Sequence, residues 1–206
     1  MQPDYAIAHS AAARGRRLEY FTIAWNSAEA IAALIAGFLA GSIALVGFGL
    51  DSVIEISSGA VLLWRLGAEH DVQRRERAER RAQRLVGICF LALAAYVAFD
   101  SIKGLVLREA PQESLFGIGV AIASLLAMPL LARAKRQVAR QLNSGAMHAD
   151  SRQTDFCAYL SAILLAGLLL NAWLGWWWAD PLAALVMIPL IAREGVESLR
   201  GERCCD

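Results

Sequence analysis

Six long apolar stretches constrain this chain more than any other feature. They occupy residues 20–40, 42–64, 85–105, 115–134, 150–172 and 181–199, and 57% of the 206 residues are hydrophobic. A helix rises about 1.5 Å per residue and the hydrocarbon core of a bilayer is about 30 Å thick, so each stretch is long enough to cross it. The sequence therefore predicts an all-α membrane protein with six transmembrane helices.

The basic residues predict how these helices are oriented. Of the 20 Lys and Arg residues, all except Lys103 and Arg108 fall in segments on one side of a six-helix drawing. Basic residues are enriched in cytoplasmic segments, so both termini are predicted to be cytoplasmic. We expect an N-terminal tail over 1–18, a six-helix domain over 19–200 with charged cytoplasmic loops near 65–84 and 133–149, and a tail over 201–206. The expected location is the plasma (inner) membrane, with the lipid bilayer as partner and no role for nucleic acid.

Acidic residues inside the apolar stretches are the strongest functional signal. Asp51 and Glu55 are four residues apart, so on a helix they share one face near the middle of the second stretch. Asp155 lies at a similar depth in the fifth stretch, and Ser151 precedes it by one turn. Carboxylates in hydrocarbon are costly and either mark an ion site or act, protonated, as packing groups. Because oxygen ligands suit divalent cations, we expect a metal site of Asp51, Glu55, Ser151 and Asp155.

Other polar residues leave more than one interpretation open. Glu29 and His148 are candidate entrance residues, although Glu29 also suits a hydrogen bond to a neighbouring helix and His148 an ordinary surface position. Cys157 follows Asp155 by two residues and is expected to point elsewhere on the helix. The terminal Cys204 and Cys205 either bind a soft metal ion or belong to a frayed end. Asp180, just before Pro181, is predicted to cap the start of a helix.

At these residues the chain resembles the cation diffusion facilitator family. Residues 41–66, GSIALVGFGLDSVIEISSGAVLLWRL, are similar to the second helix of that family, and residues 149–199 to its fifth and sixth helices. The resemblance covers most of the chain after Leu18. It implies that the second-helix acids of the family fall on Asp51 and Glu55 and its fifth-helix ligands on Ser151 and Asp155.

The resemblance also implies a function. Members move a divalent cation out of the cytoplasm by alternating access, so we expect a proton-coupled efflux transporter for Zn²⁺ or another transition metal, with no prosthetic group. Ser151 stands where zinc-selective members usually have histidine, so the cation stays open. The usual cytoplasmic domain after the sixth helix is expected to be missing, and the expected homodimer would then rest on the membrane helices. The alternative is a non-transporting membrane scaffold or regulatory subunit. An enzyme is not expected, because no His-Glu-x-x-His pattern, nucleophile elbow or phosphate loop occurs.

Overall fold

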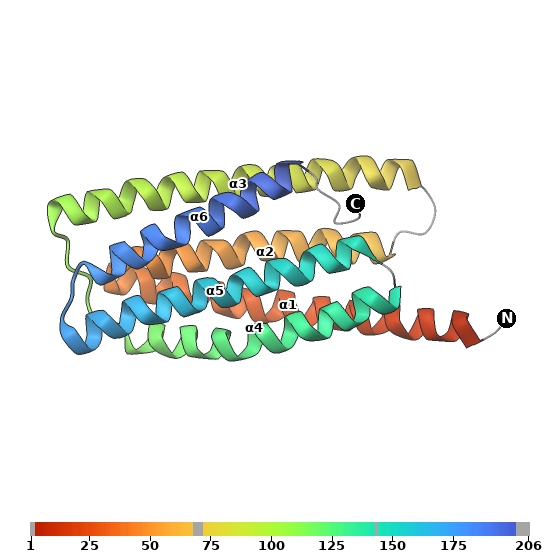
Figure 1. Cartoon of the computed structure of the whole chain (residues 1–206), viewed down its shortest axis with the longest axis horizontal. Coiled ribbons are helices and arrows are strands. Elements are labelled where there is room, and N and C mark those ends of the chain that lie inside the picture. Colours follow the sequence, from red (N-terminus) through yellow and green to blue (C-terminus); the bar gives the residue numbers. More distant parts are fainter. Residues whose placement is uncertain (1–2, 68–71, 143, 201–206) are drawn as a thin grey trace.

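The computed structural model describes residues 3–67, 72–142 and 144–200, and within them it contains six α-helices and no strand. This confirms the predicted all-α membrane fold. The helices, shown in Figure 1, are α1 (Pro3–Ala40), α2 (Ile43–Gly67), α3 (Val72–Leu107), α4 (Leu115–Leu142), α5 (Gly145–Leu174) and α6 (Ala179–Arg200).

Four of the helices form a ring. The helix α1 packs against α2 and α4, and α5 closes the ring by packing against the same two helices. The helices α3 and α6 pair with each other outside this ring, where both contact α2 and α6 also contacts α5 (Figure 1). The interior of the ring is thus bounded by α1, α2, α4 and α5.

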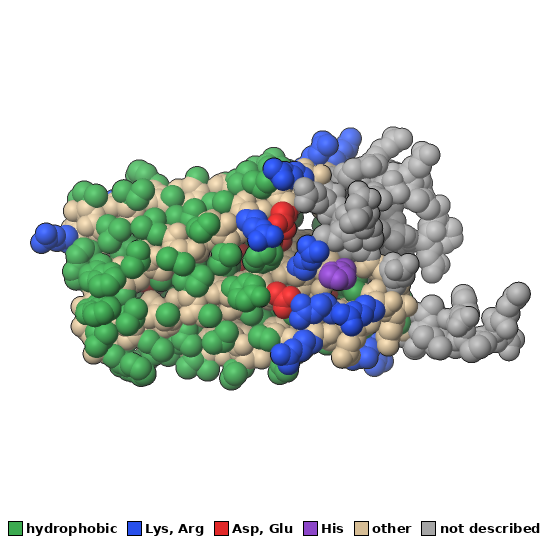
Figure 2. Space-filling view, viewed as in Figure 1, with side chains coloured by type: hydrophobic (Ala, Val, Ile, Leu, Met, Phe, Trp, Pro, Cys, Tyr) green, Lys and Arg blue, Asp and Glu red, His purple; other side chains and the backbone are tan. Residues whose placement is uncertain are grey.

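The bundle has one end rich in charge, which we call the charged end. It is the end at which α1, α3 and α5 begin and α2, α4 and α6 finish. In the space-filling view, Lys and Arg side chains gather toward this end, while hydrophobic side chains cover most of the remaining length (Figure 2). Five of the helices in the described residues are long and apolar enough to cross a membrane. The sixth, α6, carries Asp180, Arg193 and Glu194 and lies against the other helices.

Much of the charged segments is helical, as the density of Arg and Glu over residues 67–83 favours. Charged cytoplasmic loops were expected near 65–84 and 133–149, and within these ranges α3 begins at Val72, α4 continues to Leu142 and α5 begins at Gly145. The helix α1 likewise runs from Pro3 through most of the expected tail. Arg, Glu, Gln and Ala are good helix formers, and proline is tolerated in the first turn of a helix, so these helices extend beyond their apolar parts.

Two close contacts of α6 join it to α3 and to α2. A Cβ added to Gly87 of α3 would lie 2.7 Å from the carbonyl oxygen of Gly195 in α6, so these two backbones touch and only glycine fits there. At the opposite end from the charged end, the Asp180 carboxylate accepts hydrogen bonds from the Ser42 hydroxyl and from the Ile43 backbone N–H at 2.9 Å. Asp180 was expected to cap its own helix, but the hydrogen bonds of its carboxylate among the described residues go to Ser42 and to the start of α2, which carries Asp51 and Glu55.

Candidate metal centre

Asp51, Glu55 and Cys157 converge in the interior of the ring. Each offers one ligand atom, and these atoms all lie within 4.8 Å of one another. Asp51 and Glu55 are one turn apart on α2 and flank the middle of its apolar span, Ile43–Trp64. All three residues are buried. The expected juxtaposition of α2 and α5 therefore occurs, and it places two carboxylates and a thiol around one point at mid-depth.

The residue that α5 brings to this point is Cys157 and not Asp155. Asp155 is partly exposed and forms an ion pair with Arg136 of α4. Successive residues of a helix are rotated by about 100°, so residues two apart face nearly opposite directions. Cys157 and Asp155 therefore point in different directions, as expected. Cys157 faces the cluster, whereas Asp155 faces Arg136.

His148 is not among the converging residues, and the Ser151 hydroxyl is engaged within its own helix. The Ser151 hydroxyl donates to the backbone carbonyl of His148 at 2.7 Å, which ties it to the preceding turn of its own helix. His148 is half-buried near the start of α5, at the charged end, and its Nδ1 is buried without a hydrogen-bond partner among the described residues. Its candidate role at an entrance remains an expectation.

Glu29 lies beside the cluster and not at an entrance. Its Oε1 accepts a hydrogen bond from the Ser52 hydroxyl at 2.8 Å and lies 3.7 Å from the Cys157 sulfur. Its Oε2 accepts from the Trp25 indole N–H at 2.8 Å. Both oxygens of this buried carboxylate are thus engaged, which holds Glu29 of α1 against α2 and α5.

Asn26 brings a second α1 side chain to the same place. It is fully buried, and its Nδ2 donates to Glu55 Oε2 at 2.7 Å. The sequence left two interpretations of Asn26 open, the lining of an inner vestibule or a hydrogen bond to a neighbouring helix, and this contact is of the second kind. A further signal is the spacing of Glu19, Thr22, Asn26 and Glu29, which places four polar residues on one face of α1.

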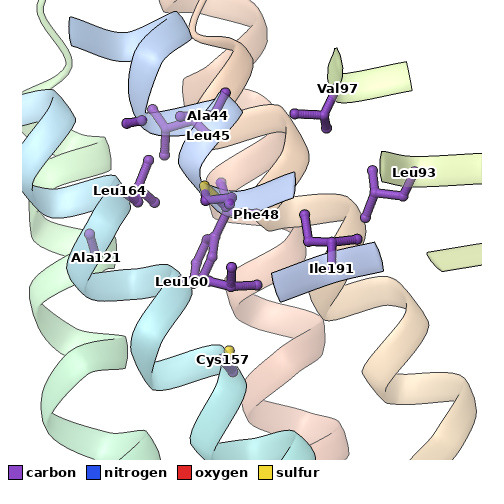
Figure 3. Packing of buried hydrophobic residues seen from close by; sticks show 14 of the residues in the cluster. Ala44, Leu45, Phe48, Leu93, Val97, Ala121, Cys157, Leu160, Leu164 and Ile191 are labelled. Carbon is purple, nitrogen blue, oxygen red and sulfur yellow. The ribbon is translucent and has the colours of Figure 1, made fainter. Parts of the chain in front are cut away.

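The interior differs on the two sides of the cluster. Toward the charged end it is polar, with buried Thr22 and Thr154 and a charged group in which Lys135 Nζ lies 3.3 Å from Glu19 Oε1 and also contacts Asp150. Toward the other end, past a hydrogen bond from the buried Ser161 hydroxyl to the buried Ser124 hydroxyl at 3.0 Å, the packing is mostly apolar. Figure 3 shows the Phe48 ring beside Leu160, with Cys157 on the next turn of α5. The packed apolar side closes the cluster off from that end.

The cluster carries an excess of acidic groups. Glu29 and Glu194 lie within electrostatic range of Asp51, and Glu29 is also in range of Glu55. Concentrated carboxylates in a low-dielectric interior repel one another, and a bound divalent cation or bound protons relieve that repulsion. Two carboxylates and one thiol are also a donor set that suits borderline or soft cations such as zinc and cadmium.

Comparison with known proteins agrees with this geometry. Residues 20–201 match the sequence profile of the cation efflux transmembrane domain. The chain is 29% identical to transmembrane protein 163 of Xenopus laevis over 75% of this chain and 53% of that protein. It is 26% identical to an uncharacterized transporter of Synechocystis, over 71% of this chain and 49% of that protein. It is also 26% identical to a cadmium, cobalt and zinc/H(+)-K(+) antiporter of Bacillus velezensis, over 78% of this chain and 53% of that protein. The chain thus spans about half the length of the curated relatives it matches.

Proposed function

Because this chain belongs to the cation efflux family, whose members are transporters and not enzymes, we propose that it moves a divalent transition-metal cation out of the cytoplasm through the cluster of Asp51, Glu55 and Cys157. The observation that carries the proposal is the convergence of three buried ligand atoms, from two helices, within 4.8 Å at mid-depth. Intramembrane carboxylates are rare and usually mark an ion pathway.

The asymmetric interior supports a direction of access. The polar faces of α1 and α5 connect the charged end to the cluster, and apolar packing around Phe48 and Leu160 closes the other side. If the charged end is cytoplasmic, as its basic residues favour, the cation would approach the cluster along this polar side. Release on the other side then requires α2 and α5 to separate near Phe48.

Proton coupling follows from the ligand chemistry. Carboxylate and thiol groups bind either a cation or protons, so the arrival of one releases the other. The Bacillus velezensis relative is named as a cadmium, cobalt and zinc/H(+)-K(+) antiporter, which supports exchange of this kind. We extend the proposal to a plasma-membrane location with both termini cytoplasmic and to a homodimer formed through the membrane helices.

The test is metal flux into proteoliposomes that contain the full chain, measured for zinc, cadmium, cobalt, manganese and iron. We expect saturable flux of at least one of these cations, and we expect Asp51→Asn and Glu55→Gln each to lower it at least about 10-fold, since both remove a ligand. Glu113→Gln, in the exposed turn between α3 and α4, is the matched carboxylate-to-amide control. Absence of flux for every cation with a folded protein would favour the non-transporting scaffold instead.

A further inference from the structure

Asn26 carries an unexplained polar atom at the centre of the bundle. Its side chain is fully buried, and Oδ1 has no hydrogen-bond partner among the described residues. Buried polar atoms almost always have a partner, so an unpaired carbonyl oxygen requires an explanation. The other half of the same amide group has a partner, because Nδ2 donates to Glu55 Oε2 at 2.7 Å.

This hydrogen bond fixes where the free oxygen lies. An N–H group can donate to the Glu55 carboxylate, whereas a carbonyl oxygen facing that carboxylate would be repelled, so the amide is oriented with Nδ2 toward Glu55. Oδ1 belongs to the same small planar group and therefore lies beside the carboxylate that forms part of the cluster. The unpaired oxygen and the three converging ligand atoms occupy one region between α1, α2 and α5.

We propose that Asn26 Oδ1 is a fourth ligand of the transported cation and that α1 supplies it. This inference rests on the proposed function. Zinc and cations of similar chemistry are commonly held by four ligands, and Asp51, Glu55 and Cys157 supply only three. An amide carbonyl is a suitable neutral oxygen donor, and it completes the set without adding another negative charge to an already acidic interior.

The four proposed ligands also limit which cations the site can hold. Magnesium and calcium prefer six or more ligands that are all oxygen atoms in most protein sites, and this arrangement of four protein donors includes one sulfur. Two carboxylates, one thiol and one amide oxygen instead suit zinc, cadmium or cobalt. One amide group then has two roles: Asn26 Nδ2 holds Glu55 in place, and Asn26 Oδ1 binds the cation.

The test is cadmium binding to the purified full chain in detergent, by calorimetry and by X-ray absorption, which counts oxygen and sulfur neighbours of the metal. Asn26→Leu removes the oxygen and should lower the affinity at least about 10-fold with one fewer oxygen neighbour. Asn26→Asp keeps an oxygen at the same place but loses the N–H donors, and because the bound divalent cation offsets the negative charge that it adds, the affinity should fall by no more than about threefold. The contrast separates a ligand from a group that only positions Glu55.

Asn171→Leu is the matched control. Asn171 is a buried asparagine on α5 whose Nδ2 donates to the Pro111 carbonyl at 3.2 Å, and it lies about 20 Å along the helix from Cys157. It should leave cadmium binding unchanged. Asn26→Ala serves as a second truncation if the leucine variant does not fold, judged by gel filtration and circular dichroism.

The possible results separate the proposed role of Asn26 from the proposed transport function. Unchanged affinity and oxygen count in Asn26→Leu, with binding lost in Asp51→Asn, would overturn the fourth ligand and leave the transport site in place. Equal losses in Asn26→Asp and Asn26→Leu would also overturn it, in favour of a hydrogen-bonding role. No cadmium binding by the original chain, or full binding by Asp51→Asn, would overturn the proposed site itself.

Discussion

Cys157 is the residue at which the proposed site departs most from an all-oxygen arrangement. It is fully buried in α5, and its sulfur faces Asp51 and Glu55 of α2. Thiolates prefer soft and borderline cations, whereas carboxylates accept hard cations as well. The balance between cadmium or zinc on one side and manganese on the other should therefore depend on this single atom.

Exchanging that sulfur for oxygen tests the dependence. In Cys157→Ser we expect cadmium affinity to fall about 10-fold or more, with a much smaller change for manganese, because the hydroxyl is a poor ligand for soft ions. Competition binding of the two metals measures the ratio, with Cys204 and Cys205, which lie outside the described residues, replaced by serine in every sample. Cys89→Ser, at an exposed position of α3, is the control. A parallel loss of both metals would mean that Cys157 does not select among them.

Asp155 gives a contrasting prediction. It forms an ion pair with Arg136 at a partly exposed position, so Asp155→Asn should leave cation flux within about twofold and change the free energy of unfolding by no more than about 1 kcal/mol. Flux into proteoliposomes and thermal unfolding in detergent measure the two effects. Loss of flux as severe as in Asp51→Asn would show that α5 rotates to bring Asp155 to the cation.

These residues show which parts of the site could be predicted from the sequence. The spacing of Asp51 and Glu55 sufficed to place both on one face, because four residues make about one turn. The inward face of α5 was harder to predict, since both Ser151 with Asp155 and the set of Asp150, Thr154, Cys157 and Ser161 have helical spacing. Packing against α2 and α4 buries the second set, and of the first it buries Ser151 while Asp155 stays partly exposed.

At the scale of elements, α2 is held at its start by a residue from α6. The first N–H groups of a helix have no partner within the helix, and the Asp180 carboxylate accepts from Ile43 at 2.9 Å and from Ala44 at 3.5 Å. It also accepts from the Ser42 hydroxyl. One acid thus joins the start of the helix that carries Asp51 and Glu55 to the start of α6.

Removal of this cap should loosen the bundle without touching the cluster. Because a single N-cap contributes about 1 kcal/mol and the Asp180 carboxylate is buried, we expect Asp180→Ala to lower the free energy of unfolding by about 1–3 kcal/mol. Thermal unfolding in detergent measures the loss. The double variant with Ser42→Ala tests whether Ser42 and Asp180 stabilise the bundle through the same hydrogen bond. If they do, Ser42→Ala should lower the free energy of unfolding much less in the Asp180→Ala background than in the original chain. Full additivity of the two losses would contradict a shared interaction.

At the scale of the whole molecule, three helices of the ring are joined by one buried group of charges. Lys135 of α4 was expected in a charged cytoplasmic loop, but its side chain is fully buried and contacts Glu19 of α1 and Asp150 of α5. This group lies on the charged-end side of the cluster. A lysine stem passes through apolar surroundings easily, and its ammonium then needs carboxylate partners because isolated buried charges are costly.

The effect of a substitution on the free energy of unfolding depends on whether it leaves a charge in this group without an opposite charge. Lys135→Met leaves Glu19 and Asp150 buried without an opposite charge, so we expect the free energy of unfolding to fall by about 3–5 kcal/mol. The triple variant that adds Glu19→Gln and Asp150→Asn removes all three charges together, and it should recover most of that loss because no uncompensated carboxylate remains. Thermal unfolding of the single and triple variants in the same detergent measures both steps. If the triple variant were no more stable than Lys135→Met, the loss would not come from buried carboxylates left without an opposite charge.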